Sequence, residues 1–152
     1  TAGITPAIKE LAVDLPVNLA LSLNAPNDTI RTVLMPVNKK YPLKDLLKEA
    51  RSFPIPARKR ITFEYILIKD VNDAAADAEE LARLLNKIPC KINLIPFNEY
   101  PAAPFKRPEE KQVLLFQAIL HQHNYTAPIR MSKGSDIVAA CGQLGASITA
   151  GR

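Results

Sequence analysis

Four apolar runs of strand length alternate with helix-like segments, and this alternation constrains the fold more than any other feature of the sequence. Residues 17–23 are apolar almost throughout, which is typical of a strand covered on both faces, as in parallel sheets. Strands that alternate with helices favour parallel pairing through right-handed crossovers. The runs are residues 17–23, 61–68, 90–97 and 126–131. The sequence therefore predicts an α/β fold with a parallel sheet or a segment of a barrel.

Helices are expected before, between and after these runs. Thr5 and Pro6 suit the start of a helix, because threonine can cap it and proline is tolerated in the first turn. Leu43, Leu46 and Leu47 recur at helical spacing. The expected helices cover residues 6–13, 28–34, 42–52, 74–86 and 108–124, and a short one begins at Ser135 or Asp136.

Composition places the chain in an ordinary class. Its 152 residues are enough for one domain with a sizeable core, and its 47% hydrophobic and 23% charged residues are typical of globular proteins. No apolar run approaches the roughly 20 residues that span a bilayer. Two cysteines form no disulfide framework, so we expect a reducing cytoplasm. The net charge of +5 permits a nucleic-acid partner without requiring one.

Polar residues follow three of the four runs. Ser22 and Asn24 end the first run, Asn98 follows the third, and the fourth leads into a polar turn at residues 132–136. Ligands bind at the carboxyl ends of strands in parallel sheets and barrels, so these residues predict a site on one rim. A helix cap explains Ser22 and Asn24 equally well, and a turn residue explains Asn98.

Cys141 lies in the predicted last helix among small residues, with Gly142 and Gly145 after it. Small neighbours leave a thiol reachable, which suits a reactive cysteine. Free cysteines are nevertheless among the most buried residues, so a structural role stays open.

Three other polar side chains need an explanation. Glu64 interrupts the clearest strand, so its carboxylate must be paired, hydrogen-bonded or next to a cavity. His121 and His123 are two residues apart and do not share a helix face, so we expect surface positions and no metal site.

Short basic clusters flank the predicted rim. Lys106 and Arg107 lie in the Pro-rich loop after the third run, and Arg130 and Lys133 lie at the end of the fourth. Most such clusters are simply solvated. At this rim they could contact the phosphates of RNA.

Taken together, several motifs resemble a known family. They are residues 22–28 with 36–38, 62–65 with 71–73, 90–98, and 139–144, in this order. The set is similar to the C-terminal half of the RlmN/Cfr family of radical S-adenosylmethionine (SAM) RNA methyltransferases. Members that methylate carbon 2 of adenine are the most similar, and those that methylate carbon 8 are an alternative. The resemblance covers nearly all of the chain.

The resemblance implies a fold and a chemistry. Residues 1–152 would be the C-terminal portion of the radical SAM core domain, within a partial (β/α)6 barrel that is TIM-like. Cys141 would be methylated by one SAM. A second SAM, cleaved at a 4Fe-4S cluster, would supply a radical that activates the methyl group for addition to adenine. The substrates would be 23S rRNA and tRNA, in the cytoplasm, with no membrane partner.

Family positions also imply site residues. Ser22, Leu23, Asn24 and Asn98 match the family's SAM contacts, although the family usually has histidine at the position of Asn24. Cys90 matches no catalytic cysteine of the family and is interpreted as a buried strand residue.

Other family parts are absent from this sequence. The cluster-binding cysteines, the resolving cysteine, the catalytic carboxylate and the accessory RNA-binding domain precede this stretch in the family. The chain also opens at Thr1 with what resembles the exit of a strand. We therefore expect a piece of a longer enzyme that is inactive alone and that self-associates through exposed barrel edges.

Two alternatives remain at the level of the sequence. One is a non-catalytic RNA-binding α/β module that uses the basic clusters. The other is a barrel enzyme that holds a small metabolite at the Cys141 rim.

Overall fold

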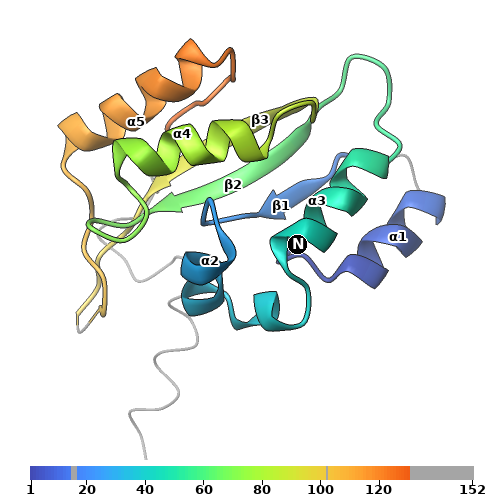
Figure 1. Cartoon of the computed structure of the whole chain (residues 1–152), viewed down its shortest axis with the longest axis horizontal. Coiled ribbons are helices and arrows are strands. Elements are labelled where there is room, and N and C mark those ends of the chain that lie inside the picture. The colour runs from blue at the N-terminus through green and yellow to red at the C-terminus, as the bar shows by residue number, and fades with distance from the viewer. Residues whose placement is uncertain (15–16, 102, 131–152) are drawn as a thin grey trace, which may run out of the picture.

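The structure is a computed structural model that describes residues 1–14, 17–101 and 103–130 (Figure 1). Most predicted helices and strands are present within this part of the chain. The elements are α1 (Thr5–Asp14), β1 (Ala20–Ser22), α2 (Asp28–Leu34), the 3-10 helix η1 (Pro36–Lys39), α3 (Leu43–Ser52), β2 (Ile61–Leu67), α4 (Ala75–Leu84), β3 (Cys90–Pro96) and α5 (Glu110–Gln122). The first strand is shorter than predicted, and η1 was not predicted.

The strands form a parallel sheet in the order β1-β2-β3, which confirms the predicted α/β class. The register places Ser22 of β1 opposite Glu64 of β2, and Glu64 opposite Asn93 of β3. Within the described residues the sheet is open and does not close into a barrel. Its carboxyl ends lie along one edge, where the site was predicted.

The predicted fourth strand is only partly regular. Residues 126–130 run parallel to β3 as two isolated bridges. Ile92 and Leu94 donate their N–H groups to the carbonyls of Thr126 and Pro128, each at 2.9 Å, and Arg130 donates to Leu94 at 2.8 Å. Pro128 has no N–H, so the bond that would reach the carbonyl of Ile92 is missing and the ladder is interrupted. Met131 lies outside the described residues.

The other side of the sheet also has a neighbour. The amino group of Thr1 donates to the carbonyl of Ala20 at 2.8 Å, and Ser22 donates its N–H to Thr1 at 2.9 Å. This alternation is the parallel-strand pattern. Thr1 therefore occupies the position of a strand residue beside β1, as its sequence context predicted.

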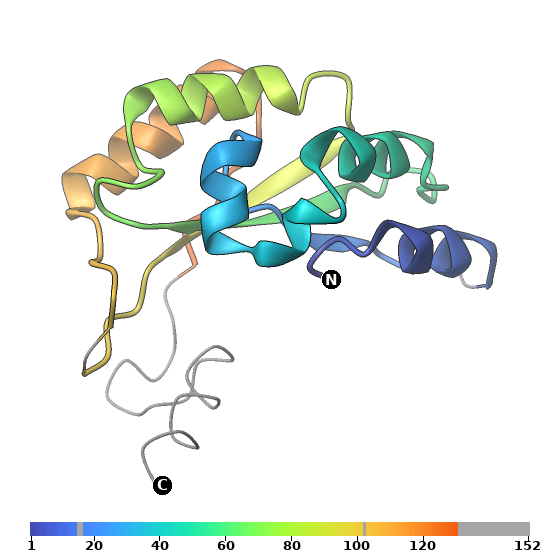
Figure 2. The ribbon, with the colours of Figure 1, turned by 60° about the horizontal axis from the view of Figure 1, so that its bottom comes forward.

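The two faces of the sheet differ. Along β2, Phe63 and Tyr65 are fully buried, whereas Thr62, Glu64 and Ile66 are partly exposed. Helices α3, α4 and α5 lie on one side of the sheet, and no described helix lies beneath β2 and β3 on the other (Figure 2). The alternating side chains of β2 thus separate an apolar core under the helices from an open, more polar face.

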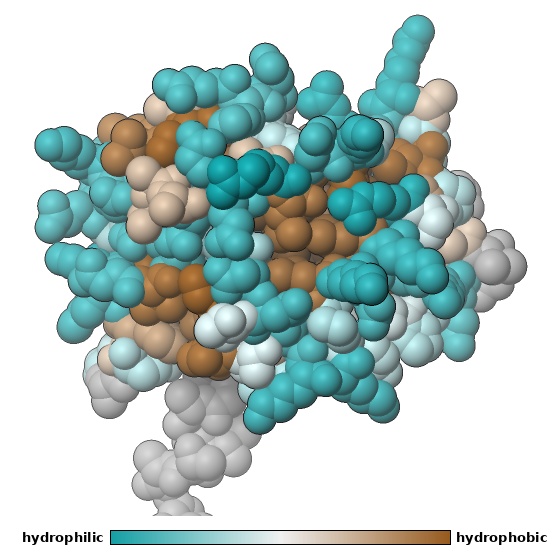
Figure 3. Space-filling model, in the orientation of Figure 1, coloured by the Kyte–Doolittle hydropathy of each residue, from teal (hydrophilic) through white to brown (hydrophobic). Residues whose placement is uncertain are grey.

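The helix layer turns a mostly hydrophilic surface outward, with apolar side chains gathered toward the middle of the view (Figure 3). Four large apolar residues are well exposed in the described part: Ile4, Val33, Leu114 and Leu115. None of the described helices combines the length and the apolar character that crossing a membrane requires.

Candidate functional site

The carboxyl end of β1 is held by buried polar side chains. The carbonyls of Ser22 and Leu23 accept hydrogen bonds from the guanidinium of Arg31, from Nη2 at 3.2 Å and from Nε at 3.0 Å. The next carbonyl, that of Asn24, accepts from Nδ2 of Asn72 at 2.8 Å. Three consecutive carbonyls are therefore fixed from the protein interior, which leaves the main chain of this strand end little freedom to move.

Arg31 is fully buried and makes no ion pair within the described residues. Its remaining bonds go to Oδ1 of Asn38 at 2.7 Å and to the carbonyl of Ala2 at 2.9 Å. Burial lowers the pKa of Arg31, and the nearby charge of Asp28 acts in the opposite direction. A buried guanidinium is tolerated only when its nitrogens are hydrogen-bonded, and here three carbonyls and one amide oxygen accept from all three nitrogens. This role of Arg31 was not predicted, because nothing in its sequence context distinguishes it from a surface arginine.

Gly3 makes room for the guanidinium. It has a φ of +98°, and a Cβ atom there would lie 3.2 Å from Nη2 of Arg31 and 3.0 Å from a methyl group of Leu46. A side chain at this position would be strained by its backbone and would crowd the buried charge.

Asn24 uses its own side chain inside the protein. Its φ is +60°, a conformation that asparagine adopts more readily than most residues. Oδ1 accepts from the N–H of Ile66 at 3.0 Å, and Nδ2 lies 3.4 Å from the sulfur of Met35. The oxygen thus extends the contact between β1 and β2, and only the weakly bonded Nδ2 is left to approach a ligand.

The other predicted SAM contacts lie on the same edge of the sheet. Ser22 is half-buried on the open face, and no described residue hydrogen-bonds its hydroxyl group. The side chain of Leu23 is fully buried, so only its main chain could meet a ligand. Asn98 is half-buried, two residues beyond β3. Because β2 separates β1 from β3, these strand ends are about 10 Å apart, which is the width of a small molecule.

Glu64 occupies the centre of the open face. Its Oε1 accepts a hydrogen bond from Nδ2 of Asn93 at 2.9 Å, and the side chain is only partly exposed. The prediction that this carboxylate must be hydrogen-bonded or paired is confirmed. Ser22, Glu64 and Asn93 form one polar row across three neighbouring strands.

The loop after β3 projects below the sheet, on the side away from the helices (Figure 2). Phe97 contacts Tyr100 and Phe105, with ring centroids 6.4 Å and 6.0 Å apart. Glu99 closes the loop: Oε2 lies 3.2 Å from Nζ of Lys106, and Oε1 accepts the N–H of Arg107 at 2.8 Å. These hydrogen bonds lower the pKa of Glu99. The sequence analysis missed this aromatic cluster, although its three rings lie close together in the sequence.

Of the predicted basic residues, Lys106 is exposed, Arg107 is half-buried and Arg130 is exposed beside the end of β3. The predictions for Lys133 and Cys141 concern residues outside the described part of the chain.

Comparison with known proteins connects the chain to a family. The chain is 61% identical over 144 residues to the dual-specificity RNA methyltransferase RlmN of Syntrophus aciditrophicus (strain SB), a match that covers 95% of this chain and 41% of that protein. It is 52% identical over 149 residues to RlmN of Syntrophotalea carbinolica, covering 98% of the chain and 40% of that protein. The chain belongs to the RlmN family.

Solved structures agree with this assignment. A radical SAM methyltransferase from Sphaerobacter thermophilus superposes with a TM-score of 0.89 at 48% identity, covering 94% of this chain and 42% of that one. A domain of a pyruvate-formate lyase-activating enzyme from Bacteroides vulgatus gives a TM-score of 0.65 at 19% identity, covering 84% and 75%, and shares the fold. No family model matches the chain.

The chain spans about two fifths of the length of the RlmN proteins that it matches, and it corresponds to their C-terminal part. The strand ends described above therefore correspond to the C-terminal part of these longer relatives.

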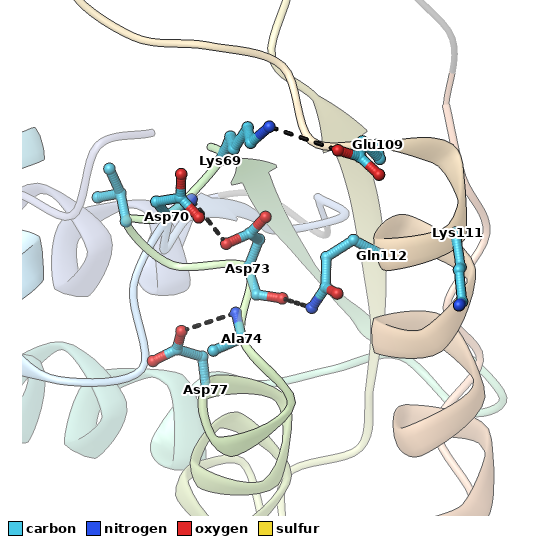
Figure 4. Close-up of a pocket in the computed structure, with 9 residues that line it drawn as sticks. Lys69, Asp70, Asp73, Ala74, Asp77, Glu109, Lys111 and Gln112 are labelled. Carbon is cyan, nitrogen blue, oxygen red and sulfur yellow. Dashed lines mark hydrogen bonds and ion pairs between the residues drawn. The ribbon is translucent and has the colours of Figure 1, made fainter.

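A pocket of about 540 Å³ opens near the end of β2, between the starts of α4 and α5 (Figure 4). Its polar groups are engaged with one another: Lys69 lies 3.4 Å from Glu109, and Gln112 donates to the carbonyl of Asp73 at 2.6 Å. Burial raises the pKa values of Asp73 and Asp77. In the described residues no three His, Cys, Asp or Glu side chains are grouped to hold a metal.

Cys90 and the histidines behave as predicted. Cys90 is 5% exposed, and burial raises the pKa of its thiol to about 12, so the group is protonated and inert at neutral pH. His121 and His123 are exposed, and Nε2 of His123 lies 2.7 Å from Glu79.

Proposed function

We propose that this chain is the C-terminal portion of the radical SAM core domain of an RNA methyltransferase that modifies carbon 2 of adenine in 23S rRNA and tRNA. The observation that carries the proposal is the 61% identity to an RlmN protein over 95% of the chain. The parallel sheet, with strand-like neighbours at both edges, is compatible with the last part of a partial (β/α)6 barrel. Both substrates are cytoplasmic RNAs, so we place the protein there.

We assign SAM binding to the carboxyl edge of the sheet, at Ser22, Leu23, Asn24 and Asn98. The groups present fit a small polar ligand. Ser22 offers a hydroxyl group without a described partner, and Asn24 offers Nδ2. The N–H and the carbonyl of Leu23 already bond Glu64 and Arg31, so Leu23 would meet a ligand through van der Waals contact of its main chain. Arg31 and Asn72 keep this strand end rigid, so a ligand would meet groups that are already in position.

Cys141 is proposed as the residue that carries the methyl group. Its thiolate would attack the methyl carbon of SAM, forming the S–CH₃ bond as the bond to the sulfonium sulfur breaks and S-adenosylhomocysteine leaves. Bound SAM supplies the activated methyl group, and a covalent cysteine divides a difficult transfer into separate steps.

The 4Fe-4S cluster of the family finds no ligands in the described residues, because these contain no suitable group of side chains. The residues that bind the cluster would lie in other parts of the full-length protein.

RNA would approach the same edge. Lys106, Arg107, Arg130 and Lys133 are the proposed phosphate contacts, and two of them are exposed beside the end of β3. Since Glu99 already pairs with Lys106, binding of a phosphate there would have to compete with a carboxylate. Phosphate contacts of this kind position RNA without reading its sequence.

The test replaces Cys141 by alanine in the full-length protein and uses Cys90→Ala as the matched control. We expect Cys141→Ala to abolish methyl transfer to RNA while reductive cleavage of SAM continues, and Cys90→Ala to retain transfer. Liquid chromatography of digested RNA against standards separates 2-methyladenosine from its isomer 8-methyladenosine, and mass spectrometry detects both. Normal methylation by Cys141→Ala would reject the proposal.

A further inference from the structure

We propose that Glu64 is a ligand-binding residue that accepts hydrogen bonds from ribose hydroxyl groups at the open face of the sheet, and that Asn93 holds it in position. This inference rests on the proposed function, because SAM and RNA are the ribose-bearing ligands that function brings to this face.

The position of Glu64 is the first argument. It lies on the middle strand, at the register position shared with Ser22 on one side and Asn93 on the other. Glutamate is a poor strand residue, and the alternate positions of β2 on the opposite face are all apolar. An ionised group at the centre of a sheet costs stability unless something compensates it.

The restraint on Glu64 is the second argument. Asn93 is 3% exposed and donates Nδ2 to Oε1 of Glu64 at 2.9 Å. A buried amide thus fixes one carboxylate oxygen. No cation of the described chain pairs with Glu64, and Oε2 has no described donor. One oxygen is anchored, and the other remains an acceptor on a partly exposed surface.

The kind of ligand follows from these groups. A carboxylate oxygen accepts hydrogen bonds only, so its partner must be a donor. Ser22 lies on the neighbouring strand about 5 Å away, with a hydroxyl group that can donate or accept. The ribose of SAM carries two adjacent hydroxyl groups, so one can donate to Glu64 while the other meets Ser22. A target nucleotide within an RNA chain keeps only its 2′-hydroxyl group, which could donate to Glu64 alone.

The experiment uses full-length protein with Glu64→Ala and Glu64→Gln. Glutamine keeps an oxygen for Asn93 and so preserves the anchor, which guards against a variant that only misfolds. Thr62→Val, on the same face two residues away, is the matched control. Calorimetry measures binding of SAM and of SAM analogues that lack the 2′- or the 3′-hydroxyl group, and a parallel arm uses RNA with 2′-deoxyadenosine at the target.

If Glu64 binds the ribose of SAM, removing a hydroxyl group weakens wild-type binding by about ten- to a hundredfold, as for a hydrogen bond to a charged group. The same analogue should cause little further loss in Glu64→Ala, whereas Thr62→Val should behave as wild type. If the RNA with 2′-deoxyadenosine binds more weakly than normal RNA to wild type but not to Glu64→Ala, Glu64 instead binds the ribose of the target nucleotide.

Equal losses in wild type and Glu64→Ala, for every deoxy ligand, would overturn the inference. Failure of the full-length wild type to bind SAM at all would instead reject the proposed function, so the two failures are distinguishable.

Discussion

Arg31 donates hydrogen bonds to the carbonyls of Ala2, Ser22 and Leu23, and to Asn38, from a fully buried position. The sequence could not predict this, because an isolated arginine in a short amphipathic helix normally faces solvent. Its burial depends on four segments that meet only in the folded chain. The sequence did indicate the strand end that Arg31 supports, because polar residues after an apolar run can be recognised without a structure.

Replacement of Arg31 by methionine should destabilise the chain by at least about 3 kcal/mol. It leaves several buried acceptors without donors, and each such group costs about 1–3 kcal/mol. Urea unfolding measures the change, with the exposed Arg83→Met as the control. Equal stability of Arg31→Met and wild type would mean that these hydrogen bonds contribute nothing.

Cys90 should make stability depend on pH in the alkaline range. Burial raises the pKa of its thiol to about 12 from an ordinary value of 9.0. Above pH 9 the unfolded thiol loses its proton while the folded thiol keeps it, so folding stability falls as pH rises, by up to about 1.4 kcal/mol per pH unit. The variant Cys90→Ala should not show this part of the fall in folding stability with pH.

The measurement is urea unfolding of wild type and Cys90→Ala between pH 8 and pH 10.5, compared as a difference so that other titrating groups cancel. The stability of wild type relative to the variant should decline across this range. A constant difference would show that the buried thiol ionises as readily as an exposed one.

At the scale of elements, the predicted runs located β2 and β3 almost to the residue, because each strand is mostly apolar and is bounded by polar or turn-forming residues. The first run was less informative. It yields only the three residues of β1, since pairing, and not composition, sets the ends of a strand. Residues 126–131 were predicted as the fourth strand, and Pro128 interrupts the ladder in the described part, residues 126–130. Proline inside an otherwise apolar run was the available signal.

Pro128→Val should complete that ladder. The new N–H at residue 128 faces the carbonyl of Ile92, which Pro128 cannot reach. We expect slow hydrogen exchange at this amide, comparable with Ile92 and Leu94, and little change in stability, because the added bond offsets the lost rigidity of proline. Pro104→Val in the exposed loop is the control and should exchange fast. Fast exchange at residue 128 would contradict the parallel pairing.

At the scale of the whole molecule, the alternation of strands and helices predicted the parallel sheet, and the rule about strand ends predicted the edge that carries Ser22, Asn24 and Asn98. The buried network behind that edge was not predictable. Arg31 and Asn72 are separated in the sequence and come together only through packing between elements. Family resemblance added roles for residues, such as Leu23, whose own chemistry suggests none.

Self-association of the 152-residue chain is a prediction at this scale. Beyond Thr1 on one side and residues 126–130 on the other, the described sheet has no further strand, so hydrogen-bonding groups lie at its edges. Light scattering during gel filtration should give a mass above 16.7 kDa that falls on dilution. A monodisperse monomer at all concentrations would contradict it.

The most direct test of the central claim is peptide mass spectrometry of the full-length protein after incubation with SAM that carries an isotopically labelled methyl group. We predict the label on the sulfur of Cys141 and none on Cys90, whose buried, protonated thiol is an internal control. An unlabelled Cys141 in protein that methylates RNA, or a label on Cys90 in its place, would contradict the account.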